Sequence, residues 1–207
     1  MPLTFYTNPM SRGRIVRWML EEVGAPYETV VLDYATTMKA PEYLAINPMG
    51  KVPAIVHDGH VVTECAAICA YLADAFPEAG LAPPLGRRAD YYRWLFYAAG
   101  PVEHAITNKS LGVAPEGQQR AMAGYGTYDL AVDTLEKAVA AHPYFAGDTF
   151  GAADVYAGSQ VAWGVQFGSL PKRPAFEEYL GRVLARPAYT RAGEIDDASL
   201  AAAPSVE

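Results

Sequence analysis

The chain has 207 residues and a formal net charge of -7, with 51% hydrophobic and 19% charged residues. An acidic chain repels phosphate backbones, which argues against nucleic acid as a partner. The apolar fraction is sufficient for packed cores, and the length fits two small domains. The N-terminus lacks the pattern of a secretory signal, and no stretch approaches about 18 uninterrupted apolar residues, so we expect a soluble, cytoplasmic protein without a membrane span.

The two cysteines, Cys65 and Cys69, stand four residues apart. Adjacent turns of a helix do not easily satisfy disulfide geometry, and two ligands alone do not make a zinc site. We therefore expect two reduced thiols in a reducing compartment and no bound metal.

The first 76 residues alternate between strand-like and helical patterns. Strands are predicted at 3–6, 27–32, 52–56 and 61–63, and helices at about 11–23, 39–46 and 64–76. Gly24 ends the first helix, and Asp58-Gly59 is typical of a hairpin turn. The order β-α-β-α-β-β-α predicts an α/β, thioredoxin-like N-terminal domain over residues 1–77.

Residues 78–86 are rich in proline and glycine and predict a linker. Strand patterns stop beyond it. Helices are predicted at 87–111, 118–140, 152–166 and 175–184, with a short piece at 187–192. We therefore expect an all-α C-terminal domain over residues 87–207, in which the chain frays from about residue 196 onward.

Four motifs resemble those of the cytosolic glutathione S-transferase family. They are Ser11-Arg12 followed by Trp18–Glu22, Asn47–Pro53, Glu64–Ile68 followed by Tyr71-Leu72, and Phe150–Asp154. Each is weak alone, but their order and spacing together are fairly specific, and the match covers nearly the whole chain. The first motif resembles the serine-type bacterial and fungal branch. The resemblance implies the glutathione transferase fold, glutathione as co-substrate and a homodimer.

Ser11 is the catalytic hydroxyl that this resemblance implies. A free thiol with a pKa of about 8.5 is only a few per cent ionised at neutral pH, and lowering that pKa by about two units requires ~2.7 kcal/mol of preference for the thiolate. A hydroxyl that donates to sulfur at a helix N-terminus supplies part of it. Ser11 as a simple helix cap is the alternative; Met10 or Tyr6 could also occupy the sulfur position.

The remaining predicted contacts to glutathione follow its chemistry. Val52-Pro53 resembles the family's cis-proline site, where the exposed Val52 backbone pairs with the cysteinyl part. Glu64 would take the γ-glutamyl ammonium, and the backbone N–H of Cys65 its carboxylate, although the family usually has serine at position 65. The three cations Arg12, Lys39 and Lys51 are candidates for anionic groups of the ligand, or else solvated surface charges. Asp154 is a capping residue in the helical domain.

The resemblance implies a glutathione S-transferase that conjugates glutathione to a small apolar electrophile, as in detoxification. Three other hypotheses remain open. They are glutathione-dependent disulfide or peroxide reduction, a non-catalytic binding module on the same fold, and isomerisation or dehalogenation of one metabolite. The electrophile would contact the helical domain, where Tyr91–Asn108 form a long aromatic and polar helix, but the sequence does not name the substrate.

Overall fold

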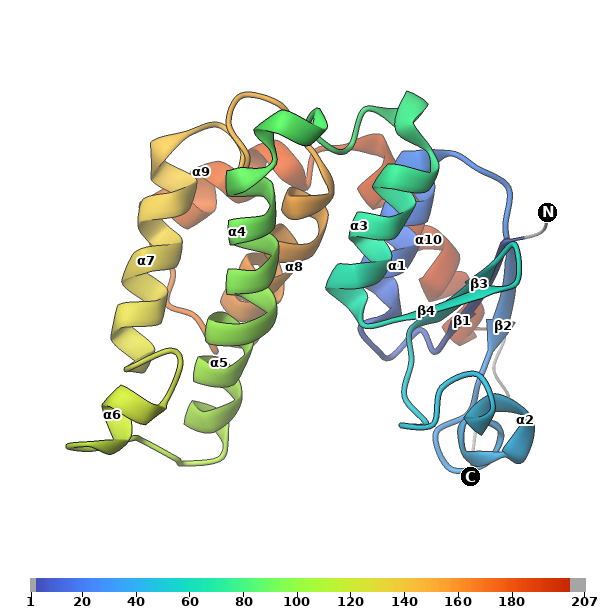
Figure 1. Cartoon of the computed structure of the whole chain (residues 1–207), viewed down its shortest axis with the longest axis horizontal. Helices are drawn as coiled ribbons and strands as arrows, with labels where there is room; N and C mark the ends of the chain where they lie inside the picture. The colour runs from blue at the N-terminus through green and yellow to red at the C-terminus, as the bar shows by residue number, and fades with distance from the viewer. Residues whose placement is uncertain (1–2, 202–207) are drawn as a thin grey trace. The chain divides into compact units, whose positions relative to one another are not determined.

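A computed structural model describes residues 3–201 of the chain. The described residues form two compact units (Figure 1). One unit contains the residues up to Ala79 together with those from Ala185 onward, and the other is Gly80–Leu184.

The first unit is built on a four-stranded mixed sheet with the strand order β2-β1-β3-β4. The strands are β1 (Leu3–Thr7), β2 (Glu28–Val31), β3 (Ala54–His57) and β4 (His60–Thr63). β1 and β2 are parallel, whereas β3 is antiparallel to both β1 and β4. The predicted Asp-Gly hairpin is confirmed, because Asp58 and Gly59 both have positive φ, at 53° and 80°.

Helices cover both faces of this sheet, as the alternation of buried residues along β1 requires. α1 (Gly13–Val23) and α3 (Cys65–Ala75) pack on the face that receives Leu3 and Phe5. On the other face, η1 (Thr37–Lys39) and α2 (Pro41–Leu44) supply Met38 and Tyr43 to a small core with Tyr6. The thioredoxin-like arrangement predicted for this part of the chain is therefore confirmed (Figure 1).

The last helix, α10 (Pro187–Ala201), packs against α1 within the first unit. The prediction of a short helix that frays from about residue 196 is wrong for residues 196–201, since Asp196 is 1% exposed and pairs with Arg17 at 3.0 Å; residues 202–207 lie outside the described part. The division into domains at 1–77 and 87–207 remains a prediction, and the compact units group α10 with the sheet rather than with the other helices.

Four ion pairs join the side chains of α1 to α10 and the residue before it. They are Arg14–Asp197, Arg17–Asp196, Glu21–Arg191 and Glu22–Arg186, at 2.6–3.0 Å. The cations of α1 lie in its first half and the acids in its second, so each set opposes the helix macrodipole. The antiparallel helix α10 presents the opposite charges in the reverse order, and this pairing compensates both unfavourable placements.

The second unit is helical. A 3-10 turn, η2 (Pro77–Ala79), ends the first stretch of the first unit, and a second, η3 (Leu85–Arg87), lies near the start of the second unit. The helices of the second unit are α4 (Ala89–Tyr97), α5 (Glu103–Ser110), α6 (Gln119–Met122), α7 (Tyr128–Ala141), α8 (Ala152–Phe167) and α9 (Pro174–Val183). Between α4 and α5, a π-helical turn, η4 (Ala98–Val102), accommodates Pro101 inside the predicted long helix.

The single helix predicted at 118–140 is wrong, because α6 ends at Met122 and α7 begins at Tyr128. Gly126 takes a left-handed conformation at φ 67°. The Thr127 hydroxyl then accepts a hydrogen bond from Leu130 N at 3.2 Å. The sequence analysis missed this combination of a helix-breaking glycine and an N-cap threonine.

α8 is the central helix of the second unit, and it begins at a buried carboxylate. Asp154 Oδ2 accepts from the N–H of Gly151 at 3.0 Å, as predicted for a capping residue. Asp154 Oδ1 accepts from Phe145 N and from the Tyr179 hydroxyl, both at 2.9 Å. Burial raises the pKa of Asp154 to about 6, and the three hydrogen bonds oppose this rise only in part.

This pKa predicts a pH-dependent stability. The folded carboxyl, with a pKa of about 6, holds its proton more tightly than the unfolded one, at 3.8. The contribution of Asp154 to stability is therefore fully present below the unfolded value and is lost as the pH rises through the folded value, by ~3 kcal/mol at most. In urea unfolding, we expect the free energy of unfolding of the wild type to exceed that of Asp154→Asn by more at about pH 4 than at about pH 7. A difference in free energy of unfolding that grows with pH would contradict the raised pKa.

Candidate functional site

Four loops converge at one edge of the sheet in the first unit. The register pairs Tyr6 with Ala54 and Ala54 with Thr63, so the end of β1, the start of β3 and the end of β4 lie side by side. The parallel strand β2 ends at the same edge, where Leu32 N donates to Thr7 O at 2.8 Å. The segments that carry Ser11, Val52-Pro53, Glu64 and Lys39 all begin or end here, which brings distant parts of the sequence to one site.

Ser11 occupies the turn between β1 and α1 and is partly buried. Its hydroxyl donates to Asn8 O at 2.6 Å and accepts from Gly13 N at 2.9 Å. Ser11 N also donates to Asn8 O, at 3.0 Å. The hydroxyl therefore caps the start of α1 through a lone pair, and its proton points to a carbonyl that has a second donor.

The peptide groups of this turn are fixed by other side chains. Asn8 donates to Leu32 O at 2.8 Å and accepts from Met10 N at 2.9 Å, so both ends of its amide are engaged. Arg14 Nε donates to Pro9 O at 2.6 Å. The Tyr34 hydroxyl donates to Met10 O at 3.1 Å. The turn is thus held rigidly around Ser11.

The other candidates for the sulfur position are less suitable. Tyr6 packs against Tyr43, with ring centroids 5.6 Å apart, in the core on the far side of the sheet. The Thr7 hydroxyl is fully buried. Met10 is 71% exposed, but a thioether has no proton to donate. Among these residues, Ser11 alone has a partly buried hydroxyl in the turn that precedes α1.

The predicted cis peptide bond between Val52 and Pro53 is present. The strand ladder starts at Ala54, so Val52 lies outside the pairing with β1 and β4. The peptide before it is fixed, because Lys51 O accepts from the Tyr43 hydroxyl at 2.6 Å and from Asn47 Nδ2 at 2.8 Å. The Val52 backbone is therefore held in position without being used by the sheet.

Glu64 precedes α3 with an exposed side chain and a φ of 65°. A positive φ is unfavourable for glutamate, and residues with such strained backbone conformations are concentrated at functional sites. Cys65, the first residue of α3, is 8% exposed and its thiol donates to Arg12 O at 3.6 Å. This contact brings the start of α3 next to the start of α1, so the N–H groups of both helices are directed to one region.

The three predicted cations, Arg12, Lys39 and Lys51, lie around this edge and are all exposed. Lys39, at the end of η1, donates from Nζ to Gly50 O at 2.6 Å. This bond links the loop after β2 to the loop before β3, so that Lys39 and Lys51 come from adjacent segments. Lys39 therefore has a structural contact that the sequence did not predict.

Sequence reasoning missed three residues of this site. A Cβ atom at Gly13 would overlap the Thr7 hydroxyl and lie 2.9 Å from Ser11 Oγ, so the turn requires glycine there. Arg17 is 2% exposed, pairs with Asp196 and lies over the Phe5 ring. Arg14 holds the turn. A Ser-Arg-Gly-Arg sequence after a strand could have signalled the close approach at Gly13.

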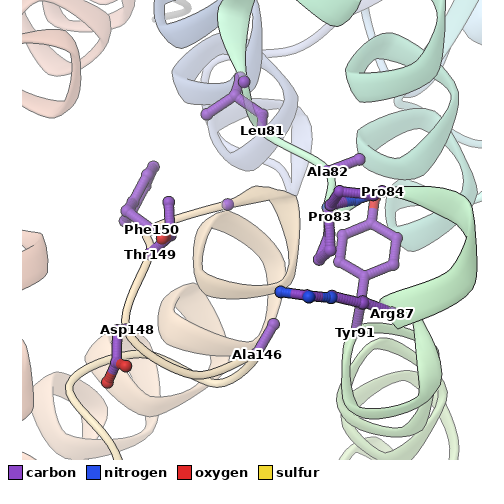
Figure 2. A pocket seen from close by; sticks show the side chains of 12 residues that line it. Leu81, Ala82, Pro83, Pro84, Arg87, Tyr91, Ala146, Asp148, Thr149 and Phe150 are labelled. Atoms are coloured by element: carbon purple, nitrogen blue, oxygen red, sulfur yellow. The ribbon is translucent and has the colours of Figure 1, made fainter.

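A cavity of about 300 Å³ lies within the second unit. It is bounded by residues 80–84, Arg87, Tyr91 and the loop before α8, and Figure 2 shows Tyr91 beside Pro83 and Pro84. None of the predicted glutathione contacts lines it. Among residues 3–201 there is no cluster of three or more metal-ligating side chains, and no helix in that range is long and apolar enough to cross a bilayer.

Comparison with known proteins agrees with this geometry. Residues 1–74 match the family model of the glutathione S-transferase N-terminal domain. Glutathione S-transferase GST-4.5 of Xanthomonas campestris is 31% identical, over 88% of this chain and 93% of its own. A glutathione transferase structure from Methylococcus capsulatus superposes with a TM-score of 0.77 and 29% identity, covering 95% of this chain and 99% of its own.

A sphingomonad glutathione S-transferase, solved in complex with glutathione, has a TM-score of 0.76 and 29% identity, covering 94% of this chain and 98% of its own. Together with the fold and the match over most of both chains, these similarities are decisive. The chain belongs to the glutathione S-transferase family and is a transferase enzyme. The serine-type branch remains a prediction.

The tight approach at Gly13 gives a first test of the site. Gly13→Ala must displace the Thr7 or the Ser11 hydroxyl, so we expect glutathione affinity to fall at least about tenfold in isothermal calorimetry. Gly181→Ala, in α9, is the control because its Cβ would meet nothing within 4 Å, and it should bind glutathione as the wild type does. Unchanged binding by Gly13→Ala would show that the turn relaxes without consequence.

The backbone of Glu64 gives a second test. Glycine adopts a positive φ without steric cost, so Glu64→Gly should raise the free energy of unfolding by about 1 kcal/mol. The same variant should bind glutathione about tenfold more weakly, because a charged contact is lost. Glu64→Ala should lose the same affinity without the gain in stability. Equal stabilities of the two variants would show that the backbone is not strained, and unchanged affinity would remove Glu64 from the site.

Proposed function

We propose that this protein conjugates glutathione to a small apolar electrophile, with Ser11 as the catalytic residue that stabilises the thiolate. The observation that carries this proposal is the position of the Ser11 hydroxyl at the start of α1, partly buried and in a turn held by hydrogen bonds. The first turn of α1 contains no acidic side chain, so the positive end of the helix is not neutralised locally.

The Ser11 hydroxyl can change its acceptor at low cost. When its proton turns from Asn8 O to the sulfur, Asn8 O keeps its hydrogen bond from Ser11 N at 3.0 Å. Gly13 N continues to donate to Ser11 Oγ, which polarises the hydroxyl and strengthens it as a donor. The thiol proton of glutathione leaves to solvent. The sulfur then forms a bond to the electrophilic carbon, and the leaving group departs with its electron pair.

The rest of glutathione fits the remaining residues of the sheet edge. The Val52 backbone beside Pro53 would pair with the cysteinyl unit like an added strand. Glu64 would bind the γ-glutamyl ammonium, and the N–H groups at Cys65 its carboxylate. The thiol of Cys65 donates to Arg12 O, so we assign the backbone, and not the side chain, to the ligand. Lys39, Lys51 and Arg12 would attract the carboxylates.

We further propose a cytoplasmic homodimer with a role in detoxification, on the basis of the family alone. The absence of a metal in the proposed reaction follows from its chemistry, because a stabilised thiolate is itself the nucleophile. The electrophile and the residues of the helical domain that would contact it remain predictions.

The decisive experiment is an ultraviolet pH titration of the glutathione thiol bound to the wild type and to Ser11→Ala. We expect the bound pKa to lie about two units below that of free glutathione in the wild type and to rise by one unit or more in the variant, because the hydroxyl donor to sulfur is lost. Ser110→Ala is the matched control, since that hydroxyl donates only to Ile106 O in an exposed helix.

The outcomes separate the alternatives. A lowered pKa that is unchanged in Ser11→Ala would move the role to backbone donors or a neighbour and would favour disulfide reduction. Failure of the wild type to bind glutathione would contradict both enzymatic functions and leave a binding module on the same fold.

A further inference from the structure

The peptide group between Pro9 and Met10, one residue before Ser11, is held from both sides. Its N–H donates to Asn8 Oδ1 at 2.9 Å, and its carbonyl accepts from Arg14 Nε at 2.6 Å. A peptide group fixed at both polar ends cannot rotate, so the direction of the chain into Ser11 is set. The Asn8 contact is local to the turn, whereas the Arg14 contact comes from α1.

Arg14 is in turn held by the far end of the chain. Its Nη2 lies 2.6 Å from Asp197 Oδ1, on α10, 183 residues away in sequence. The Arg14 and Asp197 side chains are 30% and 69% exposed, and such pairs contribute little to folding stability. One turn further along α1, the buried Arg17–Asp196 pair fixes the two helices against each other. The packing of α10 against α1 therefore places Asp197 beside Arg14.

We infer that Arg14 is a positioning residue for the Ser11 hydroxyl, and that Asp197 orients its guanidinium so that Nε meets the Pro9 carbonyl. The inference rests on the proposed function, because it needs Ser11 to act on the sulfur. It extends the site to α10, which contains none of the residues that the sequence assigned to glutathione.

The chemistry of arginine suits this position. A guanidinium carries separate donors in one rigid plane, so a single side chain can bond a carbonyl through Nε and a carboxylate through Nη2. A lysine ammonium has no such fixed fork, and it would not hold both acceptors in the same geometry. Through the two bonds of Arg14, the geometry of the Ser11 turn therefore depends on the position of α10.

A positioning role and a direct electrostatic role predict opposite results for Asp197→Asn. If the charges of this pair acted on the thiolate through space, removing the negative charge of Asp197 would favour the thiolate and lower the bound thiol pKa. If Asp197 orients Arg14, its loss loosens the Ser11 turn and raises that pKa.

The experiment measures the pKa of bound glutathione and the kcat and KM of conjugation to a chloronitroarene in the full-length protein. We expect Arg14→Met and Asp197→Asn each to raise the bound pKa by about half a unit or more and to lower kcat at least about threefold, with KM for glutathione changed less than about twofold. Arg191→Met is the matched control, because it removes the α10 ion pair with Glu21, which has no bond to the turn, and it should leave both quantities unchanged.

The Ser11→Ala background separates this inference from the proposed function. There, Arg14→Met should cause no further rise of the thiol pKa, since the group that it positions is absent. The positioning role is overturned by a fall of the pKa in Asp197→Asn, by an effect of Arg14→Met that persists without Ser11, or by equal effects of Arg191→Met. If Ser11→Ala alone leaves the thiol pKa unchanged, the proposed function itself fails.

Discussion

The charge pairing between α1 and α10, in particular that of Arg14 and Arg17 near the start of α1, is the interaction on which the candidate site depends. Arg14 and Arg17 lie toward the positive end of α1, and Glu21 and Glu22 toward its negative end, so the isolated helix would be electrostatically unfavourable. α10 presents acids and arginines in the complementary order. Because α1 starts directly after the Ser11 turn, the helix that compensates its charges also fixes where the turn lies.

The site is mostly backbone, and the sheet register determines its geometry. The ends of β1 and β4 and the start of β3 meet at one edge, and Val52 lies just outside the ladder. At Glu64 the local preference of the chain and the requirement of the site conflict, since a glutamate adopts φ 65°. Such conflicts are expected where ligand contacts, and not folding, select the conformation.

The Ser11 hydroxyl reconciles the two interpretations that the sequence left open. As an acceptor from Gly13 N it caps α1, and as a donor it has a proton whose present acceptor, Asn8 O, is also bonded by Ser11 N. A cap uses the oxygen and a thiolate contact uses the hydrogen, so one side chain can perform both. The buried capping residue Asp154 has no such second role, since all its contacts lie within the second unit.

The sequence by itself determined the element order, the thioredoxin-like sheet and the Asp-Gly hairpin, because turn chemistry and hydrophobic period are local properties. The cis bond before Pro53 and the family were expected from the resemblance of four motifs to those of known transferases. It missed the break at Gly126 and the extent of α10. Tertiary structure alone decided that Asp196 is buried and that Asp197 reaches Arg14. A polar, alanine-rich C-terminal segment has no strong periodicity, and its helix is stabilised by partners on α1 that are more than 170 residues away.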